Sequence, residues 1–418
     1  MLSNRIKFTV LLLGMMLFSG CGIEKSEGYS FIASDVEFGE EDYQKIIPSN
    51  NELGFKLLTE IDEDVEGNIF ISPSSLMMAL SMVYNGADGE TKAEIANALH
   101  LDSIDENVLN MANASLVTKL YKDTNKINLQ VANSIWLNEN YHFKEIFSKS
   151  NQDYYNAKIE TIDIFDNKSA HLINQWVKES TNDKIDEIVE DPLDENLLAF
   201  LINAIYFKGQ WTYEFDQKQT EEGHFHLRDG TMKDVSFMTL EEDLYYMETE
   251  DFQAVKLPYG DGEMSMNIFL PHENSSLHQF LELLTPDNWE RWTTKFSKKE
   301  GTIVFPKFKL EYEASLKSAL MNLGMEDAFD GQHADFSKMI EEDDQIYISD
   351  IKQKTFIDIN EEGTEAAAAT SVEMKLTSAP VDGPFYMKVN RPFLFTIVDE
   401  ETGAMIFMGS IANPPNEG

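Results

Sequence analysis

The pattern of hydrophobic and polar positions after residue 45 predicts helices mostly early in the chain and strands mostly late. The helical signals are leucines at helical spacing and a serine that can cap a helix beginning at Pro73. Helices are predicted over 51–61, over 73–86, over 91–99, and at the end of a segment that reaches 185. Strands are predicted over 68–72, 132–137, 198–206, 252–258, 264–271, 302–308, 355–359 and 385–397.

A run of small residues near the C-terminus follows the predicted strand 355–359. We name 361–370 the hinge segment: Glu361, Glu362, Gly363, Thr364, Glu365, Ala366, Ala367, Ala368, Ala369 and Thr370. A short helix capped by Thr364 is one interpretation, because alanine is the best helix former. The other is a loop able to enter a sheet, because small side chains do not overpack neighbouring strands.

The N-terminus has the order of a bacterial lipoprotein signal. Arg5 and Lys7 precede an apolar run over 8–18, and Ser19 and Gly20 precede Cys21. We predict a signal peptide over 1–20 and lipidation of Cys21, with an ordinary signal peptide as the alternative. An acidic flexible tether over 21–45 would then carry one domain over 46–415. Gly22 after the cysteine favours the outer membrane or the surface of a bacterial cell envelope, with release as a further outcome.

Charge narrows the choice of partners. The chain has 418 residues, and 33 basic minus 74 acidic residues give a net charge of −41. Such acidity argues against nucleic acid, heparin-like polyanions and anionic lipid, so membrane attachment is expected only through Cys21. The chain has a single cysteine, which excludes an intrachain disulfide.

Hydrolase and metal motifs are weak. The chain contains no Gly-x-Ser-x-Gly elbow. The segment 272–278 has Ser276 where a zinc helix needs its second histidine, and His224 with His226 would supply two ligands only. The acidic run 341–344 lacks the spacing of a calcium loop. We therefore expect no metal, cofactor or catalytic residue.

Four separated segments, in the same order, resemble the serpin family of protease inhibitors. They are 68–75, 203–211, the hinge segment and 387–395. The resemblance implies an α+β fold with three β-sheets, about nine helices and an exposed reactive loop at about 361–384. It also implies a monomer that traps serine proteases, with cysteine proteases as a second class, by inserting the cleaved loop into its main sheet.

The resemblance also implies residue roles. Ser72, Ser75, Asn203 and Gln353 occupy the positions of the family's shutter, where Gln353 replaces the usual histidine. Trp211, Lys307 and Glu361 occupy the positions of its breach, where an ion pair between Lys307 and Glu361 would hold the base of the loop. The inward-facing loop positions are expected to be Thr364, Ala366, Ala368 and Thr370, none of them charged or bulky.

Family spacing places the reactive bond at Thr377-Ser378, which suits an elastase-like protease. Lys375 would suit a trypsin-like protease, and Met374 or Leu376 a chymotrypsin-like one. Two other functions stay open at this point: a non-inhibitory surface binding protein with the serpin fold, and an envelope hydrolase with an unrecognised site.

Overall fold

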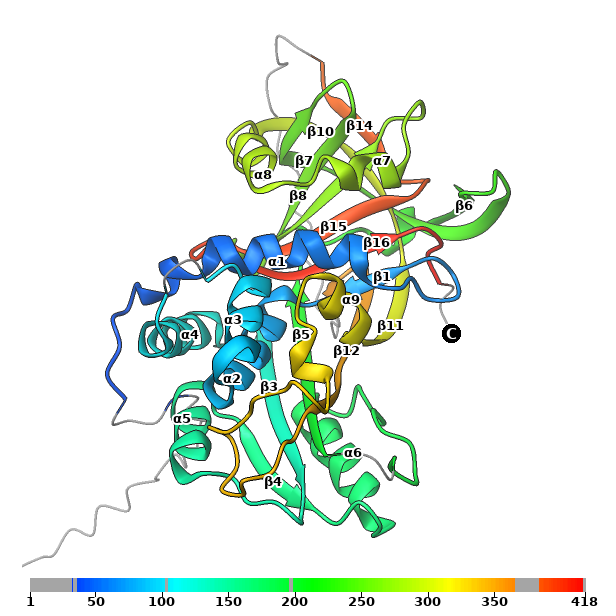
Figure 1. Ribbon diagram of the computed structural model, residues 1–418. Helices are drawn as coiled ribbons and strands as arrows, with labels where there is room; N and C mark the ends of the chain where they lie inside the picture. Colours follow the sequence, from blue (N-terminus) through cyan, green and yellow to red (C-terminus); the bar gives the residue numbers. More distant parts are fainter. Residues whose placement is uncertain (1–31, 33–35, 102–103, 195–197, 365–382, 416–418) are drawn as a thin grey trace, which may run out of the picture. The chain divides into compact units, whose positions relative to one another are not determined.

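The structure, a computed structural model, describes residues 32, 36–101, 104–194, 198–364 and 383–415. These residues belong to one compact unit that spans Phe31–Gly418. Figure 1 shows helices and strands intermixed along this unit, as expected for an α+β fold.

Nine α-helices lie in the described part of the chain, which agrees with the number expected. They are α1 (Ile47–Glu60), α2 (Pro73–Gly86), α3 (Gly89–Ala98), α4 (Glu106–Leu120), α5 (Glu145–Tyr155), α6 (Lys168–Ser180), α7 (Leu277–Glu282), α8 (Pro286–Thr293) and α9 (Lys317–Asn322). Three short 3-10 helices are η1 (Asp42–Lys45), η2 (Gln217–Gln219) and η3 (Asp327–Phe329).

The sequence predicted the start of α2 correctly and the end of α6 incorrectly. The Ser72 hydroxyl caps α2 by accepting from the Ser75 backbone N–H at 3.3 Å, as predicted. The predicted extension of α6 to residue 185 is wrong, because Asn182 and Asp183 adopt φ of 50° and 62°. Left-handed backbone cannot continue a right-handed helix.

Strands form two hydrogen-bonded sheets. The larger has the order β1 (Ile69–Ile71), β16 (Met405–Ile411), β15 (Phe393–Asp399), β9 (Met264–Pro271), β8 (Phe252–Tyr259), β7 (Met232–Glu248), β10 (Ser297–Pro306) and β14 (Phe385–Lys388), with β6 (Glu221–His226) also on β7. The long β7 joins two groups, because it pairs with β8 only over 245–248 and with β10 over 237–246. Counting these groups separately, together with the second sheet, gives the three sheets expected.

The second sheet contains the start of the hinge segment, as strand β13 (Gly363–Thr364). Its order is β11 (Phe308–Ser315), β12 (Ile348–Asn360), β13, β5 (Ala199–Gln210), β3 (Ile127–Asn138) and β2 (Lys122–Asp123), with β4 (Lys158–Ile162) on β3. Strand β5 is buried almost throughout and extends four residues beyond the predicted end at 206. We name this the main sheet.

The strand predicted over 302–308 is two strands in different sheets. Strand β10 ends at Pro306 and β11 begins at Phe308, while the backbone N–H of Lys307 donates to the Ser236 carbonyl at 2.9 Å. Proline has no backbone N–H for a ladder, so it suits the point where the chain changes sheets.

The folded part begins before residue 46, where the sequence predicted a flexible tether. Helix η1 occupies Asp42–Lys45, and Tyr43 is 6% exposed within the main hydrophobic core. The Ser115 hydroxyl of α4 also donates to the Glu40 carbonyl at 2.9 Å. The folded domain therefore begins before the predicted boundary at residue 46, because the Tyr43 side chain is buried in the core although the segment around it is acidic.

A separate hydrophobic cluster covers the lower part of the main sheet. Helix α6 and the segment after it pack Ile173, Val177 and Ile188 against Trp136 and Phe200 of β3 and β5. Figure 1 shows α6 next to β5 at the end of the molecule that also holds β4 and α5.

Candidate functional site

The beginning of the hinge segment lies inside the main sheet. Strand β13 pairs with both neighbours, Gly363 opposite Gln210 of β5 and Asn360 of β12, and Thr364 opposite Gly209 and Ile359. Farther down, β5 and β12 pair directly and in parallel, with Asn203 opposite Gln353. The sheet is therefore parted at one end by two residues of the hinge segment and closed below them.

Gly363 is required by the backbone at this entry point. Its φ is +148°, and a Cβ built there would lie 2.0 Å from the carbonyl oxygen of Gly209. Real Cβ atoms do not approach a carbonyl oxygen so closely, and this region of φ is nearly restricted to glycine. The sequence shows that residue 363 is a glycine, but not that strand β5 lies in close contact with it.

Thr364 is buried, as the inward-facing assignment predicted. It is 1% exposed, and its hydroxyl lies 2.8 Å from the hydroxyl of Tyr259 on β8. Tyr259 in turn stacks on Trp211, with ring centroids 4.2 Å apart and an interplanar angle of 15°. Burial raises the pKa of the Tyr259 hydroxyl, which therefore stays neutral in this contact.

Trp211, Lys307 and Glu361 come together at the same end of the sheet, and we name them the breach cluster. The indole N–H of Trp211 donates to the Asn360 carbonyl at 2.9 Å, and its backbone N–H donates to Glu362 at 3.0 Å. The expected ion pair is present, with Lys307 Nζ 3.1 Å from Glu361 Oε2. These contacts fix the chain on both sides of the turn that leads into β13.

The Glu361 carboxylate is almost fully enclosed and well supplied with donors. Burial alone would raise its pKa, but the hydroxyl of Thr220, a backbone N–H and the Lys307 ammonium outweigh burial and lower the pKa below its ordinary value. The Thr220 hydroxyl donates to Glu361 Oε1 at 2.7 Å. Thr220 was missed by the sequence analysis, because nothing local connects it with a residue so far along the chain.

Ser72, Ser75, Asn203 and Gln353 also come together, below the parted end of the sheet, and we name them the shutter cluster. The Gln353 amide donates to Asn203 Oδ1 at 2.8 Å and to the Ser72 carbonyl at 3.1 Å, and its oxygen accepts from the Ser72 N–H at 2.8 Å. The Ser75 hydroxyl donates to Asn203 Oδ1. All four residues are nearly inaccessible to solvent.

Gln353 satisfies this cluster without a titratable group. Its amide uses both a donor and an acceptor, as a histidine could, but its hydrogen bonds do not depend on pH.

Asn133 of β3 also belongs to this network and was not predicted from the sequence. Its side-chain oxygen accepts from Asn203 Nδ2 at 2.6 Å. An asparagine inside an apolar strand was the available signal, because a buried amide needs partners.

Several predicted site residues lie outside the described residues. They are Cys21 and the loop positions Glu365, Ala366, Ala367, Ala368, Ala369, Thr370, Met374, Lys375, Leu376, Thr377 and Ser378.

Residues of the weak metal motifs form hydrogen bonds with neighbouring protein groups. His272 Nε2 lies 3.0 Å from the Thr249 carbonyl, His224 Nδ1 lies 2.7 Å from Asp234, and Glu342 contacts the ring of His142 at 2.7 Å. Among the described residues, no three histidine, cysteine, aspartate or glutamate side chains are placed to share a metal ion. The same part of the chain holds no helix long and apolar enough to cross a membrane.

We predict that Gly363→Ala expels β13 from the main sheet, because the new Cβ would collide with the Gly209 carbonyl. Amide hydrogen exchange of Thr364 should become fast, and the free energy of unfolding should fall by about 1–3 kcal/mol. Gly383→Ala is the matched control, since a Cβ there meets nothing within 4 Å. Slow exchange at Thr364 in the alanine variant would contradict the strand placement.

Comparison with known proteins agrees with this geometry. The family model described as Serpin (serine protease inhibitor) matches residues 48–414. A serpin-like protein of Methanosarcina acetivorans is 32% identical over 381 residues, which cover 90% of this chain and 88% of that protein. Human Serpin B3 is 32% identical over 387 residues, which cover 88% of this chain and 98% of that protein.

Solved structures show the same fold. The thermophilic serpin tengpin in its native state has a TM-score of 0.82 and 35% identity, covering 91% of this chain and 96% of that chain. Human thyroxine-binding globulin complexed with its hormone has a TM-score of 0.81, covering 90% of this chain and 100% of that chain. At 24% identity, this second likeness concerns the fold alone.

Proposed function

This chain belongs to the serpin family, whose members are generally protease inhibitors rather than enzymes, and on that premise we propose that it inhibits serine proteases irreversibly. In the proposed reaction, a protease attacks the loop that joins β13 to β14 and forms an acyl-enzyme. The cleaved loop then enters the main sheet and carries the protease with it. Distortion of the protease stalls deacylation.

The position of β13 is the observation that carries this proposal. Two residues of the hinge segment already pair with both β5 and β12, while these strands still pair with each other below. Direct pairing of β5 and β12 ends at Ala204 and Lys354, so a residue five or more positions after Thr364 would enter by exchanging one ladder between β5 and β12 for two ladders of its own. Serpin loop insertion is an established case of strand addition that releases stored strain.

Extending the observed register gives a specific partner for each entering residue. Thr364 lies opposite Gly209 and Ile359, so a residue six positions later falls opposite Asn203 and Gln353. That residue is Thr370, whose hydroxyl can donate and accept. We infer that it replaces the hydrogen bond between Asn203 and Gln353 when the sheet opens, so no buried amide is left unpaired.

The two clusters have distinct proposed roles. The breach cluster holds the first turn of the hinge segment in the entry position, through Glu361 and the Trp211 contacts. The shutter cluster holds β5 and β12 together until the loop arrives. Both roles require polar groups that exchange partners while buried, because an unmade hydrogen bond costs about 1–3 kcal/mol.

Insertion to the predicted reactive bond would move the protease far. About fourteen residues, Thr364 to Thr377, at roughly 3.3 Å each span some 45 Å. Displacement over this distance would take the protease to the end of the main sheet near β4 and α5. The native state in this scheme is kinetically trapped above a more stable inserted state.

We predict a covalent complex when the protein meets an elastase-like protease, because the acyl-enzyme survives denaturation once deacylation stalls. The measurement is a denaturing gel after incubation with elastase-like, trypsin-like and chymotrypsin-like proteases. Sequencing the released C-terminal fragment should show that it begins at Ser378. A fragment that begins at Leu376 or Thr377 would overturn the assignment of the reactive bond.

Other outcomes of the same gel would replace the proposed function. Plain cleavage of the loop, without a complex, would favour a non-inhibitory binding protein with the serpin fold. Turnover of ester or peptide substrates by the protein itself would favour a hydrolase.

We further propose that a lipid on Cys21 anchors the protein to the bacterial cell envelope, most simply at the outer membrane or cell surface. Support comes from the basic, apolar and small-residue order before that cysteine. Cells fed a fatty-acid analogue should label the wild-type protein and not Cys21→Ser. The variant should leave the membrane fraction, and a variant that stays there would contradict lipid anchoring.

A further inference from the structure

The solvent face of β7, β10 and β14 lies beside the loop that the proposed function uses. Thr302 of β10 lies opposite Glu241 of β7 and Tyr386 of β14. Two residues along, Glu300 lies opposite Asp243. Side chains two apart on a strand point to the same face, so these residues form one surface. Strand β14 is the first strand after the loop, so a protease bound to the loop approaches this surface.

Two tyrosines stand out from this face. Tyr386 is 61% exposed, and Tyr245, opposite Lys298, is 52% exposed. Their backbone is held firmly, because Phe385 stacks on Tyr246 with centroids 4.4 Å apart and Gln253 donates to the Tyr386 carbonyl at 3.2 Å. Rigid exposed tyrosines are typical of surfaces that bind other proteins.

Three carboxylates on the same face lack cationic partners. Glu241, Asp243 and Glu300 form no ion pair within the described part of the chain. Glu300 and Asp243 face each other across β10 and β7, and like charges directly opposite are destabilising. Lys298 lies opposite Tyr245 on this face, and Lys388 lies over the ring of Phe237 at 5.4 Å. A cationic partner would relieve this repulsion.

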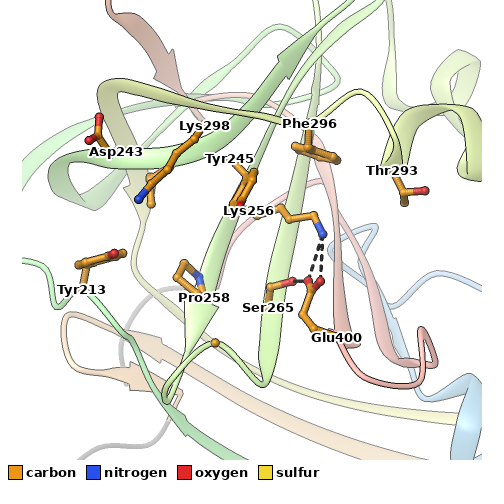
Figure 2. A pocket seen from close by; sticks show the side chains of 12 residues that line it. Tyr213, Asp243, Tyr245, Lys256, Pro258, Ser265, Thr293, Phe296, Lys298 and Glu400 are labelled. Carbon is orange, nitrogen blue, oxygen red and sulfur yellow. Dashed lines mark hydrogen bonds and ion pairs between the residues drawn. The ribbon is translucent and has the colours of Figure 1, made fainter.

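The face is hollowed at the end that holds Lys298 and Tyr245. A cavity of about 380 Å³ lies beside Asp243, Tyr245 and Lys298, whose side chains are drawn in Figure 2. Its other side holds Lys256, which is neutralised by Glu400 at 3.0 Å. The recess can receive a side chain of a bound protein without rearrangement of the sheet.

We propose that this face, defined by Glu241, Asp243, Tyr245, Glu300 and Tyr386, is a docking surface for the target protease, and that it selects proteases with a basic rim. The inference rests on the proposed function, since the loop brings the protease to this position. The net charge of −41 steers basic proteins toward the molecule at long range, and the face supplies the local contact.

The test uses two elastases of similar cleavage specificity, one of high and one of near-neutral isoelectric point. Each carries alanine in place of its nucleophilic serine, so binding is measured without cleavage or insertion. The triple variant Glu241→Gln, Asp243→Asn and Glu300→Gln should bind the basic elastase about tenfold more slowly at low ionic strength. Its association rate should also depend less on salt, and the near-neutral elastase should show little change.

A matched variant separates this surface from total charge. Glu139→Gln, Glu145→Gln and Glu160→Gln make the same change in net charge near α5 and β4, at the opposite end of Figure 1 from β10 and β14. Equal slowing by both triple variants, or no slowing by the first, would overturn the proposal. Tyr386→Ala should weaken binding of both elastases independently of salt, and unchanged binding would remove the tyrosine from the surface.

Experiments with active proteases separate the docking surface from the inhibitory mechanism. If wild-type protein forms covalent complexes with both elastases but does not prefer the basic one, the docking surface is contradicted and the inhibitory mechanism is not. Failure of wild-type protein to form complexes would contradict the inhibitory mechanism, while the binding measurements would still decide whether the face recognises a basic protease.

Discussion

Cleavage of the loop should raise the melting temperature of this protein by more than about 10 °C. In the uncleaved state, β14 anchors the C-terminal end of the loop on β10, and Gly363 and Thr364 are the hinge residues that pair within the main sheet in the described part of the chain. Cleavage frees the loop to pair with β5 and β12 along their length. The free energy gained by this pairing must exceed the conformational entropy lost when the loop becomes ordered. Small uncharged side chains at the inward-facing positions keep the remaining cost of insertion low.

The expected rise corresponds to several kcal/mol, since about 1 kcal/mol shifts the melting temperature of a domain of this size by roughly 2 °C or less. Circular dichroism during heating, before and after limited proteolysis, is the measurement. Incubation with an inactivated protease is the control, because it binds the loop without cutting. An unchanged melting temperature after complete cleavage would rule out insertion and the inhibitory mechanism with it.

Replacing Thr364 with arginine should convert the inhibitor into a substrate. Thr364 is 1% exposed between β5 and β12, and its only polar partner among the described residues is the neutral hydroxyl of Tyr259. Thr364→Arg should displace β13 from the sheet of the uncleaved protein, and insertion of the cleaved loop would then have to bury a charge without a counterion, which costs several kcal/mol. Since about 1.4 kcal/mol is a factor of ten, covalent complex should fall at least tenfold.

Thr364→Val is the matched control for this change. Valine has nearly the same shape and carries no charge, so it should keep most of the inhibitory activity despite losing the hydrogen bond to Tyr259. The gel should show intact complex for valine and a cleaved loop with free protease for arginine. Efficient complex formation by the arginine variant would contradict the inward-facing position in the inserted state.

Local rules determined much of the fold from the sequence. Ser72 and Pro73 predicted the start of α2, because a serine hydroxyl caps the first turn and proline needs no N–H there. The apolar run 198–206 predicted the buried strand β5, because a central strand is covered on both faces. The small residues of the hinge segment predicted its compatibility with a sheet, and Thr364 is indeed buried at a strand position.

Tertiary structure alone decided where those elements end and what they touch. The segment 302–308 reads as one strand, yet Pro306 and Lys307 carry the chain from one sheet to the other. The contact of Gly363 with Gly209, the hydroxyl pair of Tyr259 and Thr364, and the amides of Asn133 and Asn203 join residues far apart in the chain. Helix caps and apolar periodicity are set by neighbours within a few residues, so a sequence displays them. Partners across a sheet depend on its register, which is set by the packing of the whole molecule.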